Sequence, residues 1–264
     1  MDDERTGDLE NAIATVRQWI DAAQRIVVLT GAGISTESGI PDFRGPDGVW
    51  TKNPEAEKQA TIQNFMSDRE VRQRSWQHRL APNNWRAEPN AGHAALVELE
   101  RRGKLHTLVT QNVDGLHQKA GTSGDLMVEI HGTMQHSICM RCEQRGPIER
   151  VLERVRAGDL DPACLDCGGI LKTATISFGQ SLVTHDLERA FDAAGGCDLM
   201  LAVGSTLSVY PIAGIVPEAH KNGARIVILN AQPTEMDDIA DACLRGQIGE
   251  VLPQLVTPAA AGVA

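Results

Sequence analysis

The sequence Gly-Ala-Gly-Ile-Ser at positions 31–35 follows a short apolar run, Ile-Val-Val-Leu, at positions 26–29. Four consecutive apolar residues, three of them β-branched, predict a buried strand of a parallel sheet. Glycines at the carboxyl end of such a strand are typical of a phosphate-binding turn. Small residues let the backbone approach an anion, and the amides that open the next helix point at its charge.

The glycine pair alone does not separate a nucleotide site from an ordinary turn, because threonine stands at position 36, where a dinucleotide fingerprint has its third glycine. The continuation Gly-Ile-Pro-Asp-Phe-Arg-Gly, at positions 39–45, brings a carboxylate, an aromatic ring and a guanidinium into one loop. Such a loop beside a phosphate site is typical of a lid over a bound nucleotide. The alternative is a surface turn with an incidental Asp42–Arg44 pair.

The composition is that of an ordinary globular protein. The 264 residues are 23% charged and 42% hydrophobic, enough for one large domain or for a large and a small one. The net charge of −10 argues against nucleic acid or an anionic membrane surface as a partner and is compatible with basic protein substrates. The acidic amino terminus does not resemble a signal peptide. The uncharged stretch 199–217 is interrupted by glycines and prolines, so we expect a cytoplasmic protein without a membrane span.

Strand-like apolar runs alternate with helical spacing along most of the chain. This alternation predicts a doubly wound, Rossmann-like parallel sheet over residues 1–134 and 174–264, interrupted by a module over residues 135–173. Residues 45–88 are polar, and we expect short helices there, with a mobile subdomain as one interpretation. We expect strands at 26–29, 105–109, 127–130, 199–203 and 225–229, helices at 9–23, 90–102, 185–194, 218–222 and 249–256, and a frayed tail at 257–264.

Four cysteines in the inserted module form two Cys-x-x-Cys pairs, Cys139 with Cys142 and Cys164 with Cys167. Each pair can place two thiolates on one tetrahedral zinc ion, and four sulfurs close the shell, so the zinc would be structural. Redox pairs or disulfides are the alternative, which a cytoplasmic chain disfavours. Cys197 and Cys243 are predicted to be buried thiols.

Polar or glycine residues follow each expected strand, at Gly31, Gln111, His131, Gly204 and Asn230. Because the carboxyl ends of parallel strands share one edge of a sheet, these residues predict a ligand crevice. His131 is the natural general base, since the pKa of histidine lies near neutrality, although a structural histidine is the alternative. Asn112 and Asp114 either orient a ribose or carboxamide, or cap a turn.

Taken together, these stretches resemble the sirtuin family of NAD-dependent protein-lysine deacylases, of bacterial type. The resemblance covers about residues 27–253. It rests on the two glycine-containing stretches, the four cysteines, Thr-Gln-Asn-Val-Asp-Gly-Leu-His at 110–117, Glu-Ile-His-Gly at 129–132, Gly-Ser-Thr-Leu at 204–207 and Leu-Asn at 229–230.

The resemblance implies that NAD binds as a co-substrate between the sheet domain and the zinc module. The acyl group of a lysine in a protein substrate would pass to ADP-ribose, and nicotinamide would be released. His131 would be the base, and Asn112 and Asp114 would complete the catalytic group. The adenosine diphosphate part would contact Gly31, Ala32, Gly33, Gly204, Ser205, Thr206, Asn230 and Ile248. The nicotinamide ribose would contact Asp42, Phe43, Arg44, Gln111, Asn112 and Asp114. The acyl-lysine would contact Phe43, His131, Ile176, Phe178 and Val209.

Two departures from the family pattern leave the acyl group open. Ser177-Phe178-Gly179-Gln180 stands where the family commonly has two phenylalanines and then Gly-Glu. Members that remove succinyl or malonyl groups carry Tyr-x-x-Arg, and the nearest candidates here are Trp76-x-x-Arg79 and Ser75-x-x-His78. A preference for acyl groups other than acetyl is therefore one alternative. A mono-ADP-ribosyltransferase or NAD hydrolase on the same scaffold is another, and a non-catalytic NAD-binding module is a third.

Overall fold

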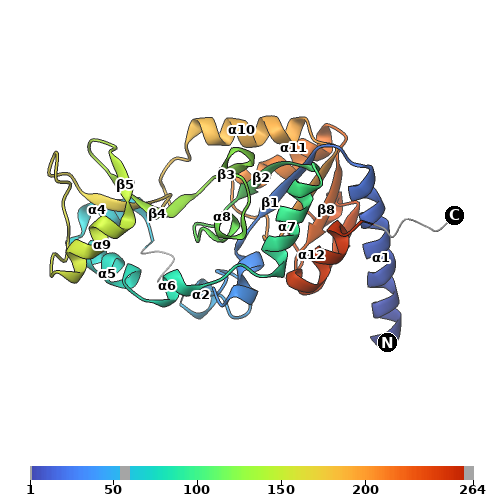
Figure 1. Cartoon of the computed structure of the whole chain (residues 1–264), viewed down its shortest axis with the longest axis horizontal. Helices are drawn as coiled ribbons and strands as arrows, with labels where there is room; N and C mark the ends of the chain where they lie inside the picture. Colours follow the sequence, from blue (N-terminus) through green and yellow to red (C-terminus); the bar gives the residue numbers. More distant parts are fainter. Residues whose placement is uncertain (1, 54–59, 259–264) are drawn as a thin grey trace.

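The computed structural model describes residues 2–53 and 60–258, and a parallel β-sheet lies at the centre of its larger part (Figure 1). Among the described residues, six strands form this sheet in the order β3-β2-β1-β7-β8-β9. Ile26 in β1 lies opposite Leu105 on one side and Leu199 on the other. The strands are β1 (Ile26–Thr30), β2 (Leu105–Thr110), β3 (Met127–Glu129), β7 (Leu199–Val203), β8 (Arg225–Leu229) and β9 (Ala242–Leu244).

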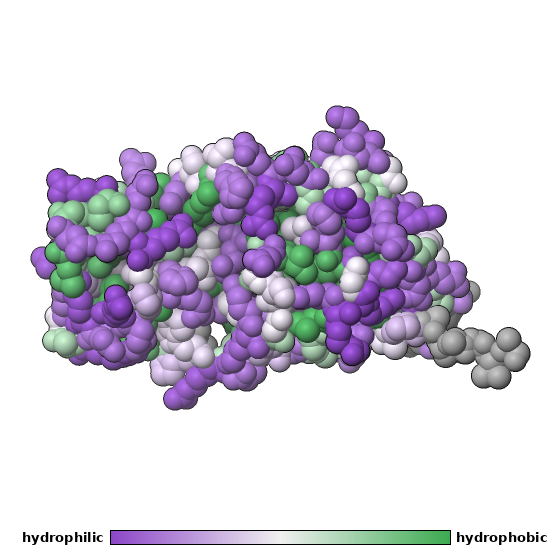
Figure 2. All heavy atoms as spheres, turned by 45° about the horizontal axis from the view of Figure 1, so that its top comes forward, coloured by the Kyte–Doolittle hydropathy of each residue, from purple (hydrophilic) through white to green (hydrophobic). Residues whose placement is uncertain are grey.

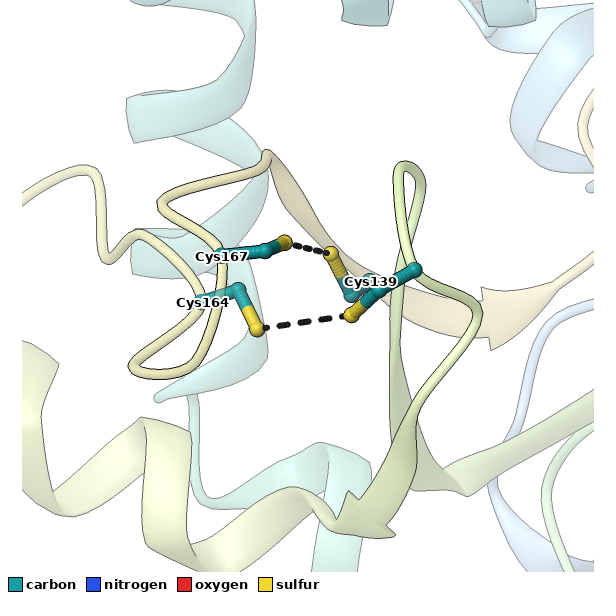
Figure 3. A group of neighbouring side chains, drawn as sticks. Cys139, Cys164 and Cys167 are labelled. Atoms are coloured by element: carbon teal, nitrogen blue, oxygen red, sulfur yellow. Dashed lines mark hydrogen bonds between the residues drawn. The ribbon is translucent and has the colours of Figure 1, made fainter.

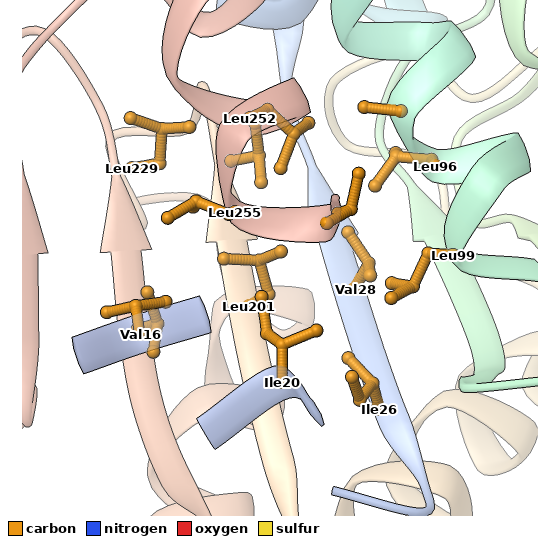
Figure 4. Close-up of a cluster of buried hydrophobic side chains, with 14 of the residues drawn as sticks. Val16, Ile20, Ile26, Val28, Leu96, Leu99, Leu201, Leu229, Leu252 and Leu255 are labelled. Atoms are coloured by element: carbon orange, nitrogen blue, oxygen red, sulfur yellow. The ribbon is translucent and has the colours of Figure 1, made fainter. Parts of the chain in front are cut away.

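Helices cover both faces of the sheet, which confirms the doubly wound α/β fold. On one face, Val28 and Leu201 of the strands share a core with Leu96 and Leu252 of the helices (Figure 4). Because successive strand residues point to opposite faces, the same apolar runs supply the second core as well. The first face carries α1 (Asp2–Ala22), α7 (Ala91–Arg101) and α12 (Ile248–Val256), and the second carries α10 (Thr184–Gly195) and α11 (Ile215–Lys221).

A small antiparallel sheet, in the order β5-β4-β6, forms the other end of the molecule (Figure 1). Its strands begin directly after His131 and end at Thr175, so the sheet extends slightly beyond the predicted module of residues 135–173. A helix beside it buries Val151 and Leu152 against Cys139. The elements are β4 (Gly132–Cys139), β5 (Arg145–Pro147), α9 (Ile148–Arg156) and β6 (Leu171–Thr175).

Short helices occupy most of residues 45–88, as predicted, and residues 54–59 lie outside the described part. Trp76 is buried in the core of the small sheet, so this segment packs on the predicted zinc module. The predicted mobility of the segment stays a prediction. The helices are α2 (Val49–Lys52), α4 (Ile62–Ser67), α5 (Arg69–Arg79) and α6 (Asn83–Arg86).

A largely buried ion pair joins α5 to Asp161, between α9 and β6. Arg72 donates from Nε and Nη2 to the two carboxylate oxygens of Asp161, each at 2.9 Å, and both side chains are at most 15% exposed. We expect Arg72→Gln to lower the free energy of unfolding by about 3 kcal/mol, because it leaves the largely buried Asp161 with the exposed Arg69, 3.7 Å away, as its remaining cationic partner among the described residues. Arg74→Gln is the matched control, since its pair with Glu70 is exposed and should contribute under about 0.5 kcal/mol. Urea unfolding of the two variants tests this, and equal effects would contradict it.

Three details differ from the sequence predictions. The first helix begins at Asp2 rather than near residue 9. The helix predicted at 218–222 begins at Ile215, because Pro217 falls in the first turn, where its missing amide costs no hydrogen bond. The edge strand β9 was missed, and Cys243 on it is exposed rather than buried, because an edge strand has one neighbour only. Cys197 is buried, as predicted.

The remaining predicted elements are confirmed in place and type. Asn90 caps α7 through a capping box, and Gly103 follows it with a φ of 68°. Within the described residues, every helix falls short of the length and apolarity needed to cross a membrane. The face drawn in Figure 2 is mostly hydrophilic, with small hydrophobic patches. The predicted tail lies largely in residues 259–264, outside the described part. The other elements are α8 (Leu116–Ala120) and the 3-10 helices η1 (Ala32–Ser38), η2 (Gly124–Leu126), η3 (Ile212–Gly214) and η4 (Asp237–Ile239).

Candidate active site

A cleft of about 2100 Å³ runs between the carboxyl edge of the large sheet and the segment formed by α4, α5 and β6. Every cofactor and substrate residue predicted from the sequence lines this one cleft. Their individual roles stay predictions. These residues are Gly31, Ala32, Gly33, Asp42, Phe43, Arg44, Gln111, Asn112, Asp114, His131, Ile176, Phe178, Gly204, Ser205, Thr206, Val209, Asn230 and Ile248.

The glycine turn after β1 packs backbone to backbone on the turn after β7. A Cβ on Gly33 would lie 2.7 Å from the Cα of Gly204, which itself has a φ of +64°. The amides of Gly31 and Gly33 donate to the carbonyls of Val203 and Gly204 at 3.0 and 2.9 Å. The prediction that the amides of this turn point at an anion is therefore wrong for these two. Glycine is needed at these positions because the two turns pack too closely to leave room for a Cβ atom.

The segment after β2 braces this turn from the other side. Gln111 donates from Nε2 to the Ser205 hydroxyl at 2.9 Å. Asn112 donates from Nδ2 to the Gly31 carbonyl at 3.1 Å and to the Ser35 hydroxyl at 3.2 Å. These bonds hold the ends of β1 and β2, which are about 80 residues apart in sequence, together at one edge of the cleft.

Asp114 caps a turn, which is one of the two interpretations that the sequence left open, and its role toward a ribose stays a prediction. Its Oδ1 accepts from the Leu116 amide at 2.9 Å and so caps α8. Its Oδ2 accepts from the Ser35 hydroxyl at 2.8 Å, within the cleft wall. Sequence reasoning did not single out Ser35, although it lies in the Gly-Ala-Gly-Ile-Ser stretch.

At the edge formed by β8 and β9, Asn230 is 9% exposed and donates from Nδ2 to the Gln232 carbonyl at 2.8 Å. Arg245 donates to the Asn230 carbonyl at 3.2 Å and pairs with Asp237. Sequence reasoning also missed Arg245, because only the unpredicted strand β9 brings it to the cleft.

His131 follows β3 and enters the cleft where the two sheets meet. Its Nδ1 donates to the Gln111 carbonyl at 3.1 Å, which leaves Nε2 with a lone pair. Burial lowers the pKa of His131, while the bond to Gln111 opposes this. Its own carbonyl accepts from the Ile176 amide at 2.8 Å, and Gly132 has no room for a Cβ, which would lie 2.1 Å from the Ala174 carbonyl oxygen. A neutral base is thus fixed between the sheets.

Aromatic rings gather in the loop predicted to act as a lid. The ring centroids of Phe43 and Trp50 are 4.5 Å apart, and those of Trp50 and Phe178 are 5.2 Å apart. The Arg44 guanidinium lies 4.6 Å from the Trp50 ring. Asp42 caps its own turn by accepting from the Gly45 amide. Phe43 and Phe178 are 43% and 36% exposed. Exposed apolar side chains that gather in this way are typical of a binding surface.

Two cations, the buried Lys172 and the partly buried Arg79, line the opposite wall. Lys172 is 3% exposed and donates to the carbonyls of Thr173 and Thr175. Burial, with Arg79 nearby, lowers the pKa of Lys172 to about 8. Burial also lowers the pKa of Arg79. In the described part of the chain, neither cation forms an ion pair with a carboxylate.

The four cysteines lie together beside the end of β4 and the start of β6, and Figure 3 labels three of them, Cys139, Cys164 and Cys167. The Sγ atoms of Cys139 and Cys167 are 3.4 Å apart, those of Cys142 and Cys164 are 3.8 Å apart, and all four lie within 4.8 Å of one another. Zn–S bonds of about 2.3 Å in a tetrahedron place sulfurs roughly 3.8 Å apart. The cluster therefore fits a zinc ion held by four thiolates, with no position left for a substrate.

His117 and His93 form a buried pair behind the cleft, with ring centroids 4.9 Å apart. Burial, and secondly the charge of His93, lowers the pKa of His117 to about 3. The unfolded chain binds this proton near pH 6.5, so stability from this group is complete above that pH and is lost as the pH falls toward 3. We expect about 2 kcal/mol less stability at pH 5 than at pH 8 from His117 alone.

Urea unfolding at the two pH values measures this loss. His117→Gln should reduce the pH dependence, while the exposed His220→Gln should not. The prediction fails if both variants keep the pH dependence of the parent chain.

Comparison with known proteins agrees with the geometry. The sequence model of the Sir2 family matches residues 31–211. An NAD-dependent protein deacetylase of Streptomyces coelicolor is 49% identical over 231 residues, which cover 88% of this chain and 96% of that protein. One from Bradyrhizobium diazoefficiens is 42% identical over 251 residues, covering 94% and 97%.

Solved structures of Sir2 enzymes share the fold. One from work on Sir2 mechanism and regulation has a TM-score of 0.84 and 38% identity, covering 94% of this chain and 97% of that one. A Sir2 protein with a peptide and NAD+ has a TM-score of 0.80 and 33% identity, covering 89% and 93%. Another, bound to a propionylated peptide, has a TM-score of 0.79 and 31% identity, covering 97% of each chain. The chain therefore belongs to the Sir2 family, the sirtuins.

Proposed function

We propose that this chain is an NAD-dependent protein-lysine deacylase, which transfers the acyl group to ADP-ribose and releases nicotinamide. The observation that carries the proposal is His131. Its Nδ1–H is bound to the Gln111 carbonyl, and its Nε2 lone pair is available in the cleft that holds the glycine turns. A neutral imidazole oriented in this way is suited to take a proton from a ribose hydroxyl.

Different parts of the same cleft fit the ADP part of NAD, its nicotinamide ribose and the acyl-lysine. The ADP part of NAD fits the edge of Gly31, Gly204 and Asn230, and the nicotinamide ribose fits the segment after β2. The acyl-lysine fits the mouth between Phe43 and Phe178, where exposed aromatic rings flank the cleft. The Sir2 structures with NAD+ and with a propionylated peptide support NAD and acylated lysine as the two ligands.

The inserted module of residues 135–173 would be stabilised by zinc, and residues 1–134 and 174–264 would bind NAD. Cytoplasmic location is proposed from the cysteines, which form no disulfide in the described residues. The net charge of −10 supports basic proteins as substrates over nucleic acid.

An acyl group that carries a carboxylate is the second candidate substrate. Arg79 and Lys172 support it, since a partly buried and a buried cation without a carboxylate partner among the described residues favour an anion. Succinyl-lysine and its neutral amide analogue, succinamyl-lysine, differ in this charge alone. A preference for succinyl that Arg79→Gln removes would support this candidate, and equal rates on the two peptides would exclude it.

Mass spectrometry of one lysine peptide carrying acetyl, propionyl, succinyl or longer acyl groups tests the main proposal. We expect NAD-dependent loss of the acyl group with formation of O-acyl-ADP-ribose. If no peptide is deacylated and ADP-ribose accumulates on protein or free in solution, the alternative transferase or hydrolase activity is correct instead.

A further inference from the structure

His117 is a buried histidine on α8 that the proposed chemistry does not use. It is 1% exposed and lies behind the wall of the cleft. Its Nε2 lies 3.0 Å from the Thr30 hydroxyl, at the end of β1. Thr30 in turn donates to the Thr110 hydroxyl at 2.9 Å, at the end of β2. Both threonines are fully or almost fully buried, so these bonds have little competition from water.

The direction of the hydrogen bonds defines which ring nitrogen of His117 carries the proton. The single hydroxyl proton of Thr30 goes to Thr110, so His117 must donate from Nε2. The ring is therefore neutral and its Nδ1 is an acceptor, which agrees with the low pKa that burial gives it. His93 Nδ1 lies 3.3 Å from the Asn90 amide nitrogen and 3.1 Å from Asn90 Oδ1, so either tautomer of His93 satisfies one of these contacts. Within the described residues, His93 Nε2 and His117 Nδ1, on neighbouring rings, have no hydrogen-bond partner.

The far end of this chain of bonds reaches the general base. Thr110 Oγ1 accepts from the Asn112 amide at 3.1 Å. The Asn112 N–H and the Gln111 carbonyl belong to one peptide unit, which is planar and rigid. That same carbonyl accepts from His131 Nδ1 at 3.1 Å. One peptide plane is therefore held by Thr110 on one edge and by His131 on the other.

We propose that His117 is a positioning residue for the general base. Through the hydroxyls of Thr30 and Thr110 it fixes the Gln111–Asn112 peptide, and this peptide fixes the tautomer and the orientation of His131. The inference rests on the proposed function for its effect on catalysis. Its effect on the His131 ring does not depend on that function.

Three substitutions test the proposal by kinetics. His117→Leu removes the donor and keeps an apolar side chain, whereas His117→Gln keeps an N–H for Thr30. Thr110→Val removes the hydroxyl without changing the shape of the side chain. We expect kcat to fall about 10- to 100-fold in His117→Leu and Thr110→Val, because the base is misplaced. KM for NAD should change less than kcat, because the side chains of Gln111 and Asn112 keep their own bonds to Ser205, Gly31 and Ser35. His117→Gln should stay within about threefold of the parent.

Thr107→Val is the matched control, since Thr107 is a buried threonine on the same strand that does not take part in the chain of bonds. The double variant His117→Leu/Thr110→Val should be no slower than either single variant, because both act through one path. Full kcat in His117→Leu, or losses that add independently, would overturn the proposal.

Histidine NMR gives a readout that does not need deacylase activity. The bond to Gln111 raises the pKa of His131, so weakening it should lower that pKa in His117→Leu and in Thr110→Val. The pKa should stay as in the parent chain in Thr107→Val. If the parent chain deacylates no peptide, the proposed function fails, yet this pKa still decides the positioning role. An unchanged His131 titration in both variants would refute it.

Discussion

Replacing His131 with alanine is expected to lower kcat/KM for deacylation about 10²- to 10⁴-fold, because general-base catalysis contributes that much. Binding of NAD should persist, since the glycine turns and the side-chain bonds of Gln111 to Ser205 and of Asn112 to Gly31 do not involve the imidazole. Single-turnover deacylation and calorimetric titration with NAD measure the two effects. His136→Ala is the matched control, because His136 is an exposed histidine on the adjoining strand β4. Deacylation by His131→Ala at the parent rate would show that another group is the base.

The pH profile provides the second half of this test. Burial moves the pKa of His131 below the usual value of histidine, and the bond to Gln111 only partly offsets the shift. The neutral, basic form therefore predominates at pH 7, and kcat/KM should stay level there. The rate should fall on the acid side, at a pH below 6.5. A decline of kcat/KM that already begins above pH 7 would mean that the His131 imidazole is protonated at neutral pH, contrary to the effect of its burial.

The sequence was sufficient for five of the six described strands of the large sheet, and its central strands are recognisable because they are buried on both faces. Such strands are runs of apolar residues like Ile-Val-Val-Leu at 26–29, and glycine or polar residues mark their ends. The strand β9 was missed for the opposite reason. Ala242–Leu244 is three residues long and lies at the edge, so it needs neither an apolar run nor two buried faces. The exposure of Cys243 follows from the same fact.

The candidate site was predictable where one residue had to follow one strand, as His131 and Asn230 do. It was not predictable where side chains from separate strands bind one another. Ser35 bonds to Asp114 and Asn112 across almost 80 residues, and His117 reaches Thr30 across 87. Nothing local in the sequence specifies these pairs, since they depend on the parallel register of β1 and β2, in which Thr30 lies opposite Thr110. A threonine at the end of both strands was the available signal.

Removal of zinc is expected to unfold the small sheet and to abolish deacylation together with it. Structural zinc in comparable four-ligand sites supplies apparent binding free energies of about 10–16 kcal/mol, far more than the small core around Leu152 can replace. Activity should be lost although the metal lies outside the cleft. Gly132, next to His131, pairs with Thr175 of β6, and Ile176 bonds to the His131 carbonyl. The base is thus held by strands that the metal stabilises.

A chelator titration followed by zinc content, limited proteolysis within residues 135–173 and deacylation tests this coupling. Cys142→Ser should reproduce the loss, whereas Cys243→Ser, outside the cluster, should keep zinc, fold and activity. Restoring zinc should restore the protease resistance and the activity at the same metal concentration, because one folding event supports both. Stoichiometric loss of zinc with the module still folded and His131 still active would show that the hydrophobic core of the small sheet suffices. The four thiols would then need an explanation other than structural metal binding.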